Sequence, residues 1–173
     1  MPWIDNGKYY TYGKKTLSQI DSITGMVRGE TVYCTDHNRI FTYEDDWMCS
    51  DFIRLENGSG GTLNRWDVVI NEPGAGVTVT CDTTTTAGNG QVLGVVVFGG
   101  SAGSQVVVAI KGNWRANCDE AIDIGDALTT STTAGEAQLN TGSYYGGVFG
   151  WATETTGAAG PVDCIITARK EFF

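Results

Sequence analysis

The chain contains one histidine, His37, the residue type that most often acts as a general acid or base. A histidine acts as a general base only where the fold places a nucleophile or a carboxylate beside it. His37 stands between Asp36 and Asn38, and these two residue types form turns because they tolerate left-handed backbone and bond their own main chain. We therefore expect a turn at residues 36–38 and no catalytic histidine.

Acidic residues follow in the same region, where Asp45, Asp46 and Asp51 could gather a calcium ion. The segment lacks the alternating ligand spacing of a calcium-binding hand, so it predicts a solvated turn instead. Asp126 follows a glycine, and we expect its carboxylate to accept hydrogen bonds from local amides in a tight turn. The HExxH and phosphate-loop motifs do not occur. We therefore predict that the protein is not an enzyme and binds no cofactor.

The cysteines are odd in number, and no two of them have CxxC spacing. With one histidine in the chain, this pattern disfavours zinc, and we expect no metal ion. It favours free buried thiols over a disulfide framework. Cys34 and Cys49 lie on adjacent candidate strands and are the pair to test. The five cysteines are Cys34, Cys49, Cys81, Cys118 and Cys164.

The charge of the chain restricts its partners. The formal net charge is −9, whereas phosphate binding needs clustered Lys and Arg and anionic membranes attract basic segments. We therefore expect neither nucleic acid nor membrane, and a basic or neutral protein surface or simple solubility fits the charge. No apolar run reaches the roughly 20 residues of a membrane helix, and residues 1–15 hold no apolar signal core. We expect synthesis in the cytoplasm.

The elements that must position any site are predicted by a strand–glycine phrase that occurs twice. Residues 92–112 read VLGVVVFGGSAGSQVVVAIKG, and residues 148–170 read VFGWATETTGAAGPVDCIITARK. Each copy predicts one β-hairpin, and a series of short strands with glycine-rich turns predicts an all-β sandwich or small barrel. Residues 91–98 form a continuous apolar run, as expected for a strand buried on both faces.

The chain divides into two predicted parts. Residues 1–57 form an N-terminal arm and β-meander with candidate strands at 31–35, 39–43 and 47–53. Residues 58–62 are small and polar and predict a linker, and residues 63–173 form the barrel. A chain of 173 residues suits one domain with such an appendage.

Aromatic residues near the two ends of the chain are the candidate contact residues. Large aromatics in terminal segments gain little unless they are buried, so they pack on their own domain, dock on another chain or stack on a sugar. Tyr144, Tyr145 and Trp151 are more simply barrel core and rim. The predicted partner-contact residues are Trp3, Tyr9, Tyr10, Tyr12, Phe172 and Phe173.

The order of these elements resembles a known family. The phrases RWDVVI, VLGVVV, QVVVAIKG, IGDALTT, VFGWATE and VDCIITA, within about residues 63–169, resemble the small β-barrel decoration, or cement, proteins on the capsids of tailed bacteriophages. Residues 26–52, MVRGETVYCTDHNRIFTYEDDWMCSDF, resemble the β-hairpin modules of phage fibres. The combination resembles a capsid decoration or head-fibre-type structural protein.

The resemblance implies a structural virion protein on the capsid exterior. Its partner would be the major capsid protein, it would form a homo-oligomer, a trimer, and it would stabilise the assembled lattice by binding it. Two other functions stay open. One is a fibre or adhesin module that recognises a host surface glycan through Trp47 or Tyr10, and the other, disfavoured by the single histidine, is an enzyme on a β scaffold.

Overall fold

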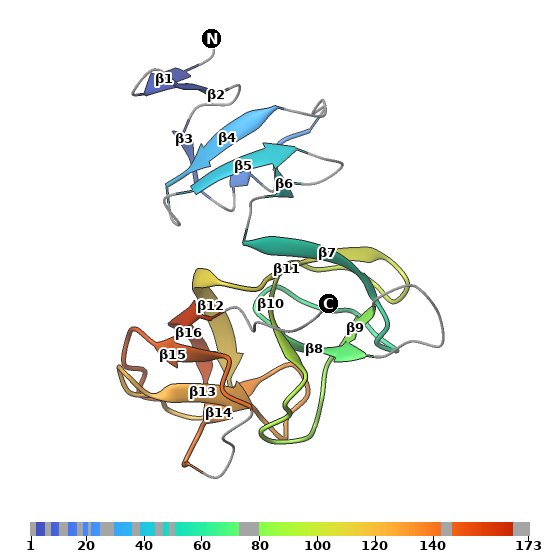
Figure 1. The fold of residues 1–173 in the computed structure, drawn as a ribbon, viewed down its shortest axis with the longest axis vertical. Coiled ribbons are helices and arrows are strands. Elements are labelled where there is room, and N and C mark those ends of the chain that lie inside the picture. Colours follow the sequence, from blue (N-terminus) through green and yellow to red (C-terminus); the bar gives the residue numbers. More distant parts are fainter. Residues whose placement is uncertain are drawn as a thin grey trace. The chain divides into compact units, whose positions relative to one another are not determined.

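A computed structural model describes residues 3–5, 8–10, 14–16, 19–20, 22–24, 30–35, 39–43, 47–48, 51–72, 80–142 and 147–167. The chain separates into two compact units, Met1–Ser50 and Asp51–Phe173. Every element labelled in Figure 1 is a strand, which confirms the predicted all-β class.

The first unit contains a hairpin and a four-stranded sheet of order β3-β4-β5-β6. Strands β4 to β6 form a meander, and β3 pairs with β4 in parallel. The third predicted strand, 47–53, is shorter than expected, because β6 covers only Trp47–Met48 and residues 52–53 belong to the next strand. Ile20, Val32, Cys34 and Phe41 are fully buried. The strands of this unit are β1 (Trp3–Asp5), β2 (Lys8–Tyr10), β3 (Lys14–Lys15), β4 (Thr31–Cys34), β5 (Arg39–Tyr43) and β6 (Trp47–Met48).

The boundary between the units differs from the predicted one, since it follows Ser50 rather than Asn57. The reason is strand β7 (Phe52–Asn57), which pairs over its length with β11 (Gln105–Ala109) of the second unit. The predicted linker is a hydrogen-bonded turn. The Asn57 side-chain amide donates to the carbonyls of Gly61 and Gly100 at 3.0 and 2.8 Å.

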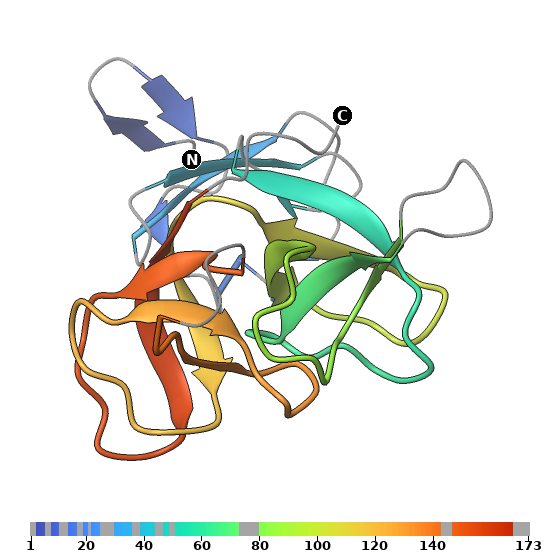
Figure 2. The same ribbon diagram turned by 60° about the horizontal axis from the view of Figure 1, so that its bottom comes forward.

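The second unit holds two closed barrels rather than the single barrel predicted for residues 63–173 (Figure 2). Each copy of the strand–glycine phrase supplies one hairpin to a different barrel: β10 with β11, and β15 with β16. Barrel 1 consists of β7, β8 (Val68–Glu72), β9 (Thr80–Asp82), β10 (Val92–Phe98) and β11. Barrel 2 consists of β12 (Gly112–Cys118), β13 (Ala127–Thr130), β14 (Ala137–Leu139), β15 (Gly150–Ala152) and β16 (Gly160–Ile166).

The two barrels have the same topology. Counting strands from one to five in each, both close in the order 4-5-1-3-2, and in both the first strand is parallel to the third. Individual hydrogen bonds repeat as well. The Trp66 amide donates to the Val96 carbonyl at 2.7 Å, and the Gly125 amide donates to the Ala152 carbonyl at 2.9 Å. The chain therefore contains an internal structural duplication.

The glycine of each phrase allows the hairpin to close tightly. A Cβ at Gly94 would lie 1.9 Å from the Ala109 carbonyl oxygen, and one at Gly150 would lie 2.6 Å from the Ile165 carbonyl oxygen. Real side chains do not tolerate such distances, so the backbones approach only where glycine is present.

Each barrel has its own apolar core. As predicted, β10 is buried on both faces, with Val92 to Val97 at most 7% exposed. The core cluster of barrel 1 is Leu55, Leu63, Val69, Cys81, Leu93, Val96, Val106 and Val108. The fully buried large side chains of barrel 2 include Ile122, Leu128, Phe149 and Ile166.

Candidate functional site

Three of the six predicted contact residues lie in the hairpin of β1 and β2. Trp3 is opposite Tyr10 in the backbone register, and Ile4 is opposite Tyr9. Tyr12, Phe172 and Phe173 lie outside the described residues. A two-stranded hairpin alone is at best marginally stable in water, and β2 contacts β4 of the same unit. The contact role of all six residues stays a prediction.

Of the three aspartates in the predicted solvated turn, only Asp51 is described, since Asp45 and Asp46 lie outside the described residues. His37 and its predicted turn lie outside them as well. Asp51 is 2% exposed, so the expected solvated turn is wrong for this residue. The Asp51 Oδ1 lies 3.2 Å from the Lys111 Nζ. The main-chain carbonyl of Asp51 accepts a hydrogen bond from the Ile110 amide. Asp51 thus ties the start of barrel 1 to the segment that links the barrels.

The turn predicted at Asp126 is confirmed. Its Oδ2 accepts a hydrogen bond from the Asp123 amide at 2.9 Å. Barrel 1 repeats this turn, because Asp67 Oδ2 accepts from the Asn64 amide at 2.7 Å. Burial raises the pKa of Asp67, and the hydrogen bonds from Asn64 and Asn117 act in the opposite direction. Both carboxylates therefore hold turns.

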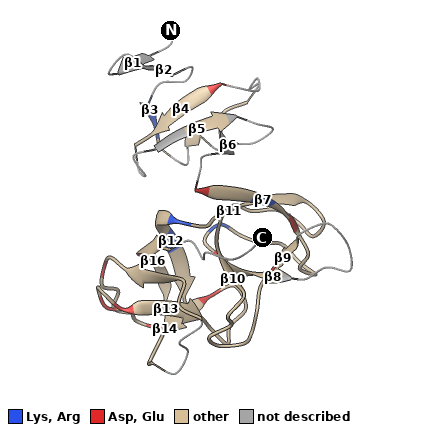
Figure 3. Cartoon of the chain, in the orientation of Figure 1, with Lys and Arg blue, Asp and Glu red and all other residues tan. Residues whose placement is uncertain are grey.

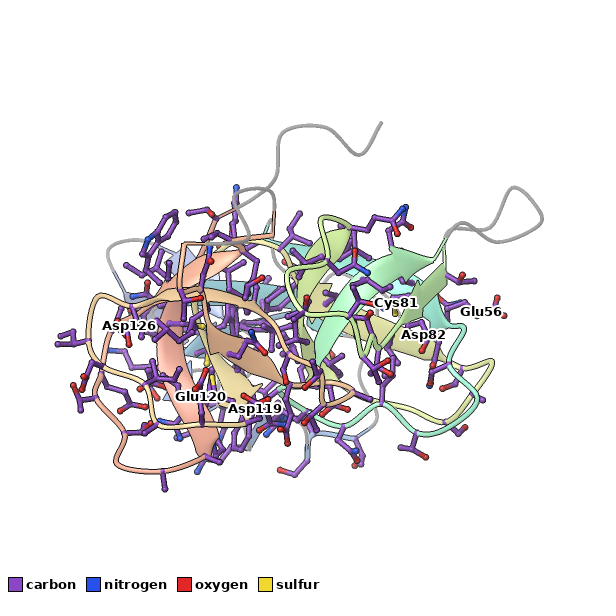
Figure 4. All side chains as sticks on the ribbon, turned by 90° about the horizontal axis from the view of Figure 1, so that it is seen from below. Glu56, Cys81, Asp82, Asp119, Glu120 and Asp126 are labelled. Atoms are coloured by element: carbon purple, nitrogen blue, oxygen red, sulfur yellow. The ribbon has the colours of Figure 1, made fainter. Side chains whose placement is uncertain are left out.

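Acidic residues of barrel 2 are frequent between β12 and β13, where Asp119, Glu120, Asp123 and Asp126 occur. Figure 3 colours the acidic positions of the chain red. Figure 4 shows Asp126 well apart from Asp119 and Glu120. Within the described ranges, no three His, Cys, Asp or Glu side chains form a group that could hold a metal ion. The described residues also include no helix that is long and apolar enough to cross a membrane.

Three cysteines of the barrels, Cys81, Cys118 and Cys164, are buried free thiols, as predicted. Burial raises the pKa of Cys81 to about 11 and the pKa of Cys118 and of Cys164 to about 12. Because the thiolate is the nucleophile and the metal ligand, these thiols are inert near neutral pH. Cys34 is buried in β4, and Cys49, the other member of the pair to test, lies outside the described residues.

The best-defined contact between the barrels involves Trp66, which the sequence analysis did not identify. Trp66 has a φ of 75° and is the one non-glycine residue with left-handed backbone in the described part of the chain. Its carbonyl accepts from the Asn117 amide at 3.0 Å, and the Arg115 guanidinium lies 5.6 Å from its ring centroid. Arg115 Nε donates to Asp163 Oδ1 at 2.7 Å, and this bond is the main cause of a raised Arg115 pKa. Arg115 is therefore held in place beneath Trp66.

Further bonds join the two barrels at their other connecting loops. The Gly88 amide donates to the Thr130 carbonyl at 3.0 Å, and the Asn89 amide donates to the Thr130 hydroxyl at 2.8 Å. These contacts form one body from two barrels, because they link several loops of barrel 1 to barrel 2.

The exposed large apolar side chains of the described residues all belong to barrel 2. Ile124 is 67% exposed, and Trp151 and Ile165 are each 43% exposed. Trp151 was expected in the barrel core or rim. It lies instead on the outer face of β15, between the buried Gly150 and Ala152.

These features define the class of the chain as an all-β protein with two fused small barrels and an N-terminal sheet. No family model matches the sequence, and no curated protein matches it. The fold is similar to a solved structure, the crystal structure of head fiber gp8.5 N base in bacteriophage phi29, with a TM-score of 0.51 and 18% identity. The similarity covers 69% of this chain and 98% of that chain. The predicted resemblance to a head-fibre-type structural protein is thus confirmed for the fold.

Proposed function

We propose that this chain is a structural virion protein attached to the outside of a bacteriophage capsid. The observation that carries the proposal is the similarity of fold to the phi29 head fibre base, which extends over 98% of that chain. On this proposal the chain is made in the host cytoplasm, resides on the capsid exterior and has no enzymatic activity.

The chemistry of the described residues supports a structural role. The thiols are buried with raised pKa values, and the carboxylates of Asp67 and Asp126 hold turns. Closed barrels have no free strand edges, which protects against non-specific strand pairing. Such a body suits a protein that presents a stable surface.

The proposed partner is the major capsid protein, contacted by the aromatic residues of the N-terminal hairpin. Trp and Tyr dominate the energetics of protein interfaces, and Trp3, Tyr9 and Tyr10 lie together on β1 and β2. Tyr12, Phe172 and Phe173 complete the proposed set. A homo-oligomer, in the proposal a trimer, would present this set several times.

Binding would stabilise the capsid by mass action. A protein that binds only the assembled lattice stabilises it by about 3–4 kcal/mol per site at 100 to 1,000 times its dissociation constant. Repeated over a shell, this stabilisation resists the pressure of packaged DNA.

Co-sedimentation with undecorated phage heads tests the proposal. The full chain is compared with Trp3→Ala and Tyr10→Ala, and with Ile124→Ser as a control for loss of an exposed apolar side chain in barrel 2. We expect the full chain and the control to sediment with heads, and each hairpin variant to bind at least tenfold more weakly. If the full chain does not bind heads, the capsid proposal fails, and glycan binding becomes the function to test.

A further inference from the structure

One row of side chains crosses the outer face of barrel 1. In the strand registers, Val68 is opposite Val95, Val95 is opposite Ala109, and Ala109 is opposite Phe52. Their neighbours Val69, Val96 and Val108 belong to the core cluster, so these four side chains point outward. All are nevertheless buried, at 1%, 0%, 0% and 6% exposure. We name Val68, Val95, Ala109 and Phe52 the first outer row.

Barrel 2 covers this row. At one end, the Val68 amide donates to the Gly135 carbonyl of barrel 2 at 2.7 Å. At the other end, the ring centroids of Phe52 and Trp114 of barrel 2 are 4.8 Å apart. Between these ends, β10 contacts β12. The first outer row is therefore a surface on which one barrel of this fold packs against another barrel of the same fold.

Barrel 2 has the same row at the same topological positions. Ala127 is opposite Trp151, Trp151 is opposite Ile165, and Ile165 is opposite Asn113. We name these four residues the second outer row. It crosses four adjoining strands, which corresponds to a width of about 14 Å at the usual strand spacing. Unlike its counterpart, it is open, with Trp151 and Ile165 each 43% exposed.

The second outer row continues the interface between the barrels. Asp163 lies two residues before Ile165 on β16, and its Oδ1 accepts a hydrogen bond from Arg115 Nε at 2.7 Å. The Arg115 guanidinium in turn lies over the ring of Trp66 of barrel 1. At this margin the Arg115 guanidinium faces two carboxylates, because Glu154 also lies 3.9 Å from it.

Charge also bears on what can bind there. Two copies of a chain with a net charge of −9 repel each other. The four residues of the second outer row carry no charge, so a second copy that docks on this row buries no charged side chain of the row itself. A Trp and an Ile at the centre of a patch with a polar margin are typical of protein interfaces.

We propose that the second outer row binds a barrel of a second copy of this chain. The first outer row shows that this position accepts a barrel of the same fold, and in barrel 2 the equivalent position is left open. The inference deepens the proposed self-association and rests on it, but it does not depend on capsid attachment.

Sedimentation equilibrium of the full chain tests the inference. We expect the average mass of the wild-type protein to rise with concentration, and Trp151→Ser and Ile165→Thr each to raise the dissociation constant at least tenfold. Ile124→Ser removes a more exposed apolar side chain outside the row, and we expect it to change the dissociation constant of self-association less than twofold. Trp151→Tyr, which keeps a large aromatic, is expected to retain most of the association. Thermal unfolding of every variant verifies that it is folded.

The outcomes separate this inference from the proposed function. A wild-type chain that stays monomeric at its highest soluble concentration overturns the inference, as does association that Trp151→Ser and Ile165→Thr leave unchanged. If these variants keep their self-association but lose binding to phage heads, the row is a capsid contact, and the inference fails while the proposed function stands. If the variants lose association while no form binds heads, the inference stands and the proposed function fails.

Discussion

The substitution Gly94→Ala tests the explanation of the strand–glycine phrase. Its Cβ would lie 1.9 Å from the Ala109 carbonyl oxygen, and real Cβ contacts essentially never fall below 3.0 Å. The backbones of β10 and β11 must therefore separate by at least about 1.1 Å. Overpacking of a core costs about 1–3 kcal/mol, and loss of two hairpin hydrogen bonds adds about 1 kcal/mol each. We expect Gly94→Ala to lower the free energy of unfolding by about 3–5 kcal/mol.

Thermal and urea unfolding of the full chain measure this loss. In a unit of 123 residues (Asp51–Phe173), each kcal/mol of lost stability lowers the Tm by about 4 °C. The expected loss therefore lowers the Tm by roughly 10–20 °C. Gly150→Ala is the graded comparison, because its closest distance is 2.6 Å, and we expect a loss of about 1–2 kcal/mol. Gly157→Ala is the matched control, since nothing lies within 4 Å of its Cβ. A Gly94→Ala variant as stable as Gly157→Ala would refute the close-approach argument.

Two further predictions concern the link between the barrels and the thiols. In a double-mutant cycle of Trp66→Gly with Arg115→Gln, urea unfolding should give a coupling of about 0.5–1 kcal/mol. Trp66→Gly alone should change the free energy of unfolding little, because relief of the left-handed backbone returns about 1–2 kcal/mol. A coupling of zero between the two substitutions would contradict a role for the ring contact. For Cys81, Cys118 and Cys164, a thiol reagent at pH 8 should label the unfolded chain and spare the folded one, as mapped by mass spectrometry. Since burial raises their pKa from 9.0 to about 11 or 12, unfolded thiols ionise first as the pH rises. The free energy of unfolding should therefore fall as the pH rises above about 9, and it should fall less steeply in Cys164→Ala. The same dependence on pH in Cys164→Ala and in the wild-type protein would contradict this prediction.

The sequence predicted what depends on local pattern. Both hairpins, the strand buried on two faces and the turn at Asp126 follow from a period of two, a continuous apolar run and turn chemistry. The division into two barrels depends on distant pairing instead, such as Glu56 with Gln105. Strands β9 and β14 have three residues each, too few to show a period. Short strands with regular turns fit one barrel or two equally well.

The candidate site was predictable only in part, for a similar reason. Aromatic residues near the ends indicated contact surfaces, but the burial of Asp51 depends on Lys111, which is distant in sequence. Likewise, the exposure of Trp151 depends on which face of β15 points into a barrel. A comparison of RWD at residues 65–67 with IGD at residues 124–126 would have identified the strained position, because a tryptophan stands where the repeat has a glycine.

The differences between the two repeats indicate which surfaces the chain uses internally. At the turn, barrel 2 has Gly125, which adopts a φ of 92° without strain, whereas barrel 1 keeps Trp66 at a φ of 75°. A strained residue persists only where its surroundings stabilise it, and Arg115 and Asn117 of barrel 2 do so here. The turn of barrel 1 is thus adapted to an internal partner, while the turn of barrel 2 shows no such adaptation.

At the centre of the outer rows, barrel 2 rather than barrel 1 carries the larger apolar side chains. The first is made of medium or small apolar residues with one Phe, and it is covered within the chain. In the second, the central positions carry Trp151 and Ile165, larger than their counterparts Val95 and Ala109, and they are open. Exposure of such side chains lowers solubility without a gain to the isolated chain. They occupy the position at which barrel 1 of this chain packs against barrel 2, and the proposed self-association would remove them from water.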